Sequence, residues 1–142
     1  MPLINFGSIL NFAEEIETQN RDFYTAAAQN PECAECHDLF TQFVRDAKKN
    51  IQNVQRTRRE NVTGMILEQI RDFTRAPFCE SYEGVDAMNA QQAIATALQL
   101  EDRAVRYYGQ AAKKLKAMSE VSRALKILAK KHTGHYNKLK EL

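Results

Sequence analysis

Apolar residues recur at three- and four-residue steps along four long stretches of the chain, the spacing of one face of an α-helix. The stretches predict helices over residues 7–29, 31–58, 89–116 and 119–140. In the last of them the apolar positions are Val121, Leu125, Leu128, His132, His135, Leu139 and Leu142. Because steps of four and three alternate throughout, we expect both histidines on the side of the helix that faces the core.

The connections predict how these helices are arranged. The links at 29–31 and 117–119 are short, which favours antiparallel helical hairpins. The segment from about Asn61 to Met88 is long, and it contains a short helical candidate, "MILEQIRDF". Two hairpins joined by one long crossover are a known bundle topology. The predicted fold class is therefore an all-α four-helix bundle, with residues 1–142 as a single domain.

The composition argues against several classes of protein, namely nucleic-acid-binding, membrane and disulfide-rich proteins. A net charge of +2 is too small to indicate nucleic acid as a main partner. No apolar run approaches the length of a membrane span, and the first residues do not read as a signal peptide, so we expect no membrane partner. Three cysteines are an odd number for a disulfide framework. A reducing, cytoplasmic location is the simpler interpretation.

The two predicted hairpins also repeat each other. Aligning the first helix with the third brings Glu17 onto Glu101 and Tyr24 onto Tyr108. A repeated helix pair can bury one shared core with approximate two-fold symmetry. At the middle of that core each repeat carries polar residues, which are Glu17, Asn50, Glu101, His132 and His135.

The segments "AEEIETQNRDFYTAAA" and "ATALQLEDRAVRYYGQAA" resemble the first and third helices of the rubrerythrin branch of ferritin-like proteins. In that pattern a glutamate ligand precedes an aromatic pair by six residues, as Glu17 and Glu101 do here. The resemblance covers nearly the whole chain. It implies a ferritin-like bundle that binds iron, with metal ligands on all four helices.

The second and fourth helices depart from the family pattern, which has Glu-x-x-His on each of them. The expected glutamate and histidine of the second helix fall on Ala47 and Asn50, and alanine cannot ligate a metal. In the fourth helix the expected glutamate is His132, whereas His135 keeps the histidine position. The resemblance therefore implies a degenerate site in which one divalent metal, iron or zinc, is bound by Glu17, Glu101, His132 and His135.

Simple chemistry supports a site of some kind at these residues. Side chains three apart on a helix share a face, and buried carboxylates need a cation or a partner. A metal-free network of histidines and glutamates would also satisfy the carboxylates, so the alternative is a metal-free bundle that serves as an interaction or thiol-redox module. Asp46 and Glu14 lie about 100° or more around their helices from the core-facing positions, and we expect them on the solvated surface. Whether the protein is an enzyme stays open.

The pentapeptide "CAECH" matches the C-x-x-C-H pattern of covalent haem attachment at Cys33, Cys36 and His37. Haem is not favoured, because attachment normally occurs outside the cytoplasm. A redox dithiol is a second possibility, since the first turn of a helix lowers the pKa of a thiol such as that of Cys33. Simple packing of the two cysteines is the leading interpretation.

The crossover carries the apolar residues Met65, Ile66, Ile70, Phe73 and Phe78. We expect them to pack against the bundle or against a second copy of the chain. The predicted association is a homodimer with two-fold symmetry, the commonest oligomer. The sequence identifies no redox partner.

Overall fold

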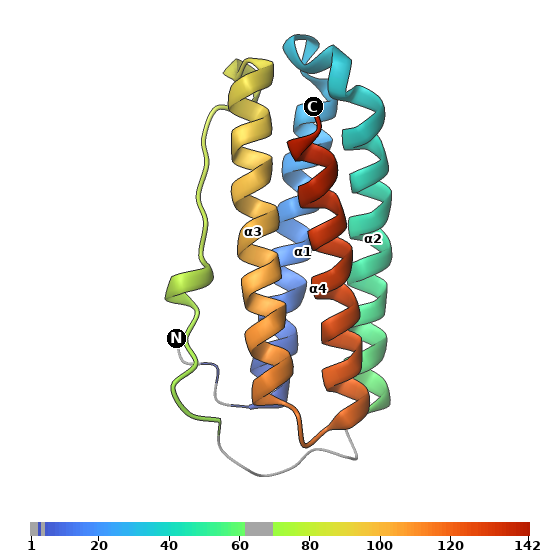
Figure 1. The fold of residues 1–142 in the computed structure, drawn as a ribbon, viewed down its shortest axis with the longest axis vertical. Helices are drawn as coiled ribbons and strands as arrows, with labels where there is room; N and C mark the ends of the chain where they lie inside the picture. The colour runs from blue at the N-terminus through green and yellow to red at the C-terminus, as the bar shows by residue number, and fades with distance from the viewer. Residues whose placement is uncertain (1–2, 4, 62–69) are drawn as a thin grey trace.

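A computed structural model describes residue 3, residues 5–61 and residues 70–142, and four long helices dominate it (Figure 1). They are α1 (Phe6–Gln29), α2 (His37–Glu60), α3 (Ala90–Lys114) and α4 (Ser119–Lys140). The chain runs up α1 and down α2, then down α3 and up α4, so each pair is an antiparallel hairpin. The predicted all-α four-helix bundle is confirmed.

Local hydrogen bonds explain where the helices begin. Asn89 caps α3 and forms a reciprocal capping box with Gln92, a pair of residue types typical of this motif. An equivalent capping box between Asn5 and Ser8 begins α1. Each box satisfies backbone N–H groups that have no partner within the helix.

The second predicted helix is not continuous. Residues Pro31–Cys36 form a short 3₁₀ segment, η1, in which Cys33 has non-helical backbone angles (φ −107°, ψ 23°). The α-helix begins only at His37. Asn30 caps η1 by accepting a hydrogen bond from the Glu32 N–H, and its side-chain amide also donates to the carbonyl of Met88. This end of the first hairpin is therefore tied to the end of the crossover.

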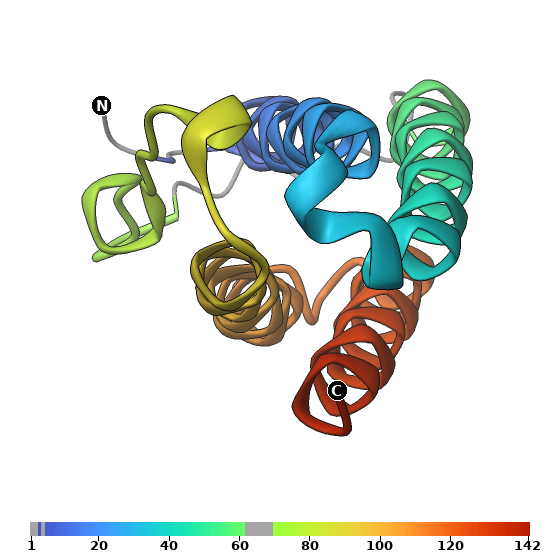
Figure 2. The same ribbon diagram turned by 90° about the horizontal axis from the view of Figure 1, so that it is seen from above.

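The described part of the crossover runs along the side of the bundle formed by α1 and α3 (Figures 1 and 2). It contains two short 3₁₀ turns, η3 (Ala76–Phe78) and η4 (Val85–Ala87). Phe73 and Phe78 are buried, with ring centroids 5.6 and 5.3 Å from that of Tyr107. These crossover residues therefore pack against the chain's own bundle.

Part of the crossover prediction lies outside the described residues. Met65, Ile66 and most of the helical candidate "MILEQIRDF" fall in the range 62–69. The remainder of that candidate, residues 70–73, is not helical in the structure. Asp72 there has a positive φ of 58°, which is incompatible with a continuing right-handed helix.

The buried apolar residues form two clusters. One contains Ala13, Ile16, Tyr108 and Leu125, and the other contains Phe23, Phe40, Phe43 and Leu139. Along α1, Glu17 lies between the first cluster and the second, and His132 and His135 have the same place between Leu128 and Leu139 on α4. The polar residues therefore form a layer across the middle of the core.

The apolar faces of the helices agree with prediction in most places. On α3 the larger apolar residues Ile94, Leu98 and Val105 are only half-buried, and the fully buried positions include Ala93, Leu100 and Ala104. Small alanines on this face allow the neighbouring helices to approach closely. Leu142 is exposed beyond the end of α4. Among the described residues, no helix combines the length and apolar character needed to cross a membrane.

Candidate metal centre

Residues from all four helices meet in the polar layer at the centre of the bundle. α1 contributes Glu17, α2 contributes Asn50, α3 contributes Glu101, and α4 contributes both His132 and His135. Both glutamates have no exposed surface, and His132 is only 2 % exposed. Such groups need partners inside the protein, because water cannot solvate them.

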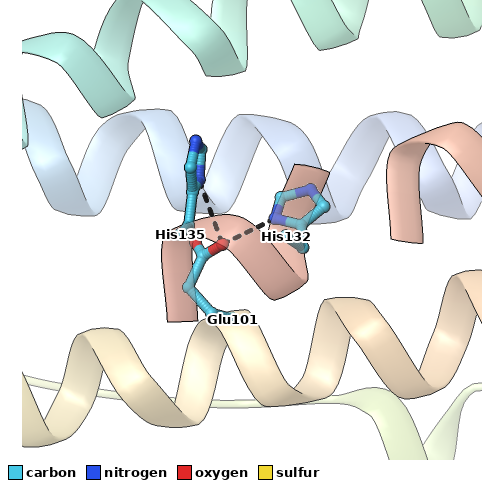
Figure 3. A group of neighbouring side chains, drawn as sticks. All are labelled: Glu101, His132 and His135. Atoms are coloured by element: carbon cyan, nitrogen blue, oxygen red, sulfur yellow. Dashed lines mark hydrogen bonds and ion pairs between the residues drawn. The ribbon is translucent and has the colours of Figure 1, made fainter. Parts of the chain in front are cut away.

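Glu101 lies between the two histidines (Figure 3). Its Oε1 atom is 2.7 Å from His132 Nδ1 and 3.1 Å from His135 Nδ1. Candidate ligand atoms of the three residues all lie within 4.8 Å of one another. Across the described ranges 5–61 and 70–142, this is the one group of three such residues close enough to share a metal ion.

His132 contacts a second carboxylate on the other side of its ring. Its Nε2 atom lies 2.7 Å from Glu17 Oε2. Burial alone would lower the pKa of His132, but Coulombic attraction to Glu17 and Glu101 and hydrogen bonds to both raise it to about 10. Burial likewise favours the neutral form of Glu101, yet attraction and hydrogen bonding to His132 and His135 lower its pKa to about 2. Without a metal, His132 is therefore an imidazolium held between two carboxylates.

The sequence-predicted ligands are thus not equivalent in the structure. Glu101, His132 and His135 come together in one group, as expected for a shared site. Glu17 lies within the same layer but at the far nitrogen of the His132 ring. It contacts one histidine of the group and neutralises its charge.

His135 is held by Asp46, a residue that we expected on the solvated surface. Nε2 of His135 lies 2.9 Å from Asp46 Oδ2, and the Asp46 side chain is 32 % exposed. Asp46 is partly exposed, but the sequence did not predict its contact with the His135 ring, which reaches between α2 and α4 to meet it. The ring also stacks on Phe43, with centroids 3.9 Å apart. The Glu14 side chain is similarly exposed, at 30 %, but it pairs with Arg58 and Gln55 of α2 and not with a histidine of the layer.

Two tyrosines complete the layer with the two-fold symmetry of the repeat. Tyr24 of α1 donates a hydrogen bond to Glu101 at 2.8 Å, and Tyr108 of α3 donates to Glu17 at 2.5 Å. Burial, followed by interaction with the nearby carboxylates, raises the pKa of both hydroxyls well above the ordinary value. Both remain neutral donors, and each ties one repeat to the other. The sequence repeat marked these tyrosines but not their role.

Arg103 is a buried residue that the sequence analysis missed. It is 1 % exposed and donates to the Phe78 carbonyl and to the side-chain oxygens of Gln19 and Asn20. Its described hydrogen-bond partners include no carboxylate. Burial lowers the pKa of Arg103, and the charges of Glu80, Glu17 and Glu101 oppose that change through space. Arg103 therefore adds a second buried positive charge beside the layer.

On α2 the structure agrees with the departure from the family pattern. Ala47 is buried and offers no donor atom. Asn50 donates through Nδ2 to Glu17 Oε1 at 3.1 Å, which leaves its buried Oδ1 without a partner among the described residues. The donors that fit a metal are therefore those of α3 and α4.

Cys33 and Cys36 are packed at the start of the second half of the first hairpin. Cys33 and Cys36 are free and buried, and burial raises the pKa of both thiols. The predicted lowering of the Cys33 pKa was wrong, because Cys33 lies inside the packed 3₁₀ segment. Packing explains both residues. His37 lies on the surface, where Nδ1 is 2.8 Å from the Ala28 carbonyl oxygen.

The fold and this layer define a four-helix bundle with carboxylates and histidines facing inward from its helices. A model of the ferritin-like domain family matches residues 7–140. The chain therefore belongs to the ferritin-like domain family. A search of curated proteins and a search of solved structures each found no match.

Proposed function

We propose that this ferritin-like protein binds one divalent metal ion, iron or zinc, through Glu101, His132 and His135. The observation that carries the proposal is their geometry. Three buried residues offer ligand atoms within 4.8 Å of one another in the layer where the family pattern has its metal ligands.

The donor set suits such an ion. Two imidazoles and one carboxylate are a common ligand set for zinc and for non-haem iron, with room for a further ligand. Metal-ligating histidines usually hold their second nitrogen against a carboxylate, which fixes the ring. Asp46 has this position at His135, and Glu17 has it at His132. When bound, the metal would supply Lewis-acid or redox chemistry, consistent with a role in iron or redox handling.

The surroundings favour one ion over two. Ala47 removes a carboxylate of the family's two-metal pattern, and His132 replaces another. Arg103 adds a buried positive charge close by. A second divalent ion would bring further positive charge into a layer that has only two fully buried carboxylates, Glu17 and Glu101. Membership of the rubrerythrin branch stays part of this proposal.

A metal-free polar core is the competing function class, and one observation favours it. Both ring nitrogens of His132 lie 2.7 Å from a carboxylate oxygen. A proton on each nitrogen satisfies this arrangement without an ion. Metal ligands must lose their protons, so a metal would have to displace the proton on Nδ1. Metal affinity should consequently rise with pH.

The decisive experiment is elemental analysis of freshly purified protein, followed by titration of the chelator-treated protein with Fe²⁺ and Zn²⁺. We expect about one equivalent in the wild type, and none in His135→Ala or in Glu101→Ala/His135→Ala. His37→Ala removes a surface imidazole and Cys33→Ser removes a buried thiol, and both should retain the metal. Equal metal content in the wild type and the double variant would leave the metal-free core as the correct reading.

A further inference from the structure

A pocket opens between α2 and α4 onto the outer side of the polar layer. It is lined by Asp46, Lys49 and Asn50 of α2 and by Lys131, Gly134, His135 and Lys138 of α4. Its volume is about 270 Å³, below the range typical of drug-sized ligand sites. A water molecule takes about 30 Å³ in the liquid, so the pocket has room for a small ion with several waters.

The charge around this pocket is positive. Three exposed lysines line it against the single carboxylate of Asp46, which His135 already engages. No carboxylate of the described residues lies within ion-pair distance of the three lysines. Their ammonium groups are therefore available to a ligand, and they disfavour a free cation at this entrance.

One residue of the pocket's inner wall, Asn50, carries a buried, unsatisfied acceptor. Asn50 is 1 % exposed, and its Oδ1 has no hydrogen-bond partner among the described residues. The amide cannot be reversed without loss, because Nδ2 donates to the Glu17 carboxylate. A buried acceptor without a donor is costly, so Asn50 favours a ligand that carries a hydrogen.

Gly134 keeps the pocket open from the α4 side. A Cβ atom built at this position meets no atom within 4 Å, so open space lies beside the helix here. The glycine lies within the continuous helix α4, between the two histidines, and adds no side chain to the pocket lining.

From these observations we propose that the α2–α4 pocket binds a small oxyanion bearing a hydroxyl hydrogen, of the hydrogencarbonate or hydrogenphosphate type. The anion's charge is neutralised by Lys49, Lys131 and Lys138, and its hydroxyl donates to Asn50 Oδ1. The proposal depends on the pocket and not on the metal site. It requires no metal, although a bound anion would lie next to His135.

The test is a titration of chelator-treated, ¹⁵N-labelled protein with inorganic phosphate at pH 7 and constant ionic strength, followed by NMR. Saturable shifts are expected at Lys49, Asn50, Gly134 and His135. Sulfate has a similar size but no hydroxyl hydrogen at this pH, and it should bind more weakly. Hydrogencarbonate, run in parallel, identifies which of the two oxyanions the pocket prefers.

Matched variants distinguish anion binding in the pocket from attraction to the general surface charge. Lys49→Gln/Lys131→Gln/Lys138→Gln should weaken phosphate binding at least about fivefold, given the modest strength of each exposed ion pair. The control variant Lys48→Gln/Lys126→Gln/Lys130→Gln removes the same charge from the same two helices outside the pocket and should bind like the wild type.

A third variant keeps every charge. Gly134→Leu should occupy the open space and abolish the saturable shifts while the helical spectrum is retained. Equal phosphate affinity in the two lysine variants, or shifts that never saturate, would overturn the proposal. The metal experiment has no bearing on this outcome, since a protein that binds no metal can still bind the anion and the reverse also holds.

Discussion

Asp46 is the outermost residue of the polar layer, and it shows how a surface residue can govern the buried site. A carboxylate that holds the second nitrogen of a ligating histidine orients the ring and increases its basicity. We predict that Asp46→Ala lowers metal affinity about 10- to 100-fold, without removing a ligand. Competition against a chromophoric chelator measures the metal affinity of the variant and of the wild type.

Asp38 lies exposed on the same helix and provides the control. Asp38→Ala should leave the affinity unchanged. If Asp46→Ala binds metal as tightly as the wild type, the contact with His135 has no part in the site.

The metal-free protein should have its greatest stability in mildly acidic solution. The pKa of His132 is raised to about 10, so its contribution is complete below the unfolded value of about 6.5 and is lost as the pH rises through 10. The pKa of Glu101 is lowered to about 2, so its contribution is complete above the unfolded value of about 4.5 and is lost as the pH falls through 2.

Urea unfolding between pH 3 and pH 10 in the presence of a chelator measures the loss of stability on the acid side and on the alkaline side. His132→Gln should be less stable at pH 6, because two buried carboxylates lose their cation. It should also lose the decline between pH 7 and pH 10. If His132→Gln loses stability between pH 7 and pH 10 as the wild type does, other groups cause that loss.

Single residues are also where sequence reasoning reached its limit. Helical spacing predicted that Glu17, Glu101, His132 and His135 face inward, and each is buried. Spacing describes where the Cα lies on the helix and not how far a side chain reaches, so it missed the contact between Asp46 and His135. Arg103 was missed for a different reason. A guanidinium is ordinarily solvated, and only the carbonyl and amide oxygens supplied by the crossover and α1 permit its burial.

At the scale of the elements, two glycines should respond to alanine in opposite directions. Gly134 is inside α4, exposed, and has open space where a Cβ would lie. Gly134→Ala should therefore stabilise the protein by about 1 kcal/mol through helix propensity. Gly84 precedes η4 with a φ of +66°, a left-handed conformation. Gly84→Ala should destabilise by about 1–2 kcal/mol.

Urea denaturation of the two single variants measures both changes. Destabilisation by Gly134→Ala would mean that the helix is constrained at this point by something other than propensity. A neutral Gly84→Ala would mean that the turn before α3 can relax to an ordinary conformation.

The helices themselves were largely predictable because their signals are local. The capping box of Asn89 and Gln92 lies within four residues, and the apolar face of α2 follows directly from its spacing. The start of α2 was not predictable from the sequence, since the break at Cys33 depends on packing of η1 against the ends of the other elements. The burial of Ala93 and Ala104 on α3 in place of larger neighbours likewise depends on which helices approach it.

For the whole molecule, association stays a prediction. The apolar residues Phe73 and Phe78, which motivated it, are covered by the chain's own bundle. Among the described residues, Ile127 and Leu142 are the large apolar side chains that remain exposed. We predict a homodimer in sedimentation velocity at micromolar concentration, and Ile127→Lys on α4 tests whether that surface contributes. A single 16.3 kDa species in the wild type would contradict the dimer.

Metal binding should stabilise the entire bundle, because the polar layer joins the two hairpins. The proposed ligands belong to α3 and α4, while Glu17 of α1 and Asp46 of α2 hold the two histidines. A ligand present at 100 times its dissociation constant, and bound only by the folded state, adds about 2.7 kcal/mol to the free energy of unfolding. We therefore expect Zn²⁺ to raise the urea midpoint of the wild-type protein and a chelator to reverse the increase. Glu101→Ala/His135→Ala should have the same midpoint with and without Zn²⁺. If the wild type also shows no shift at saturating Zn²⁺, the ion does not bind the folded bundle preferentially, and the layer acts as a metal-free connection between the hairpins.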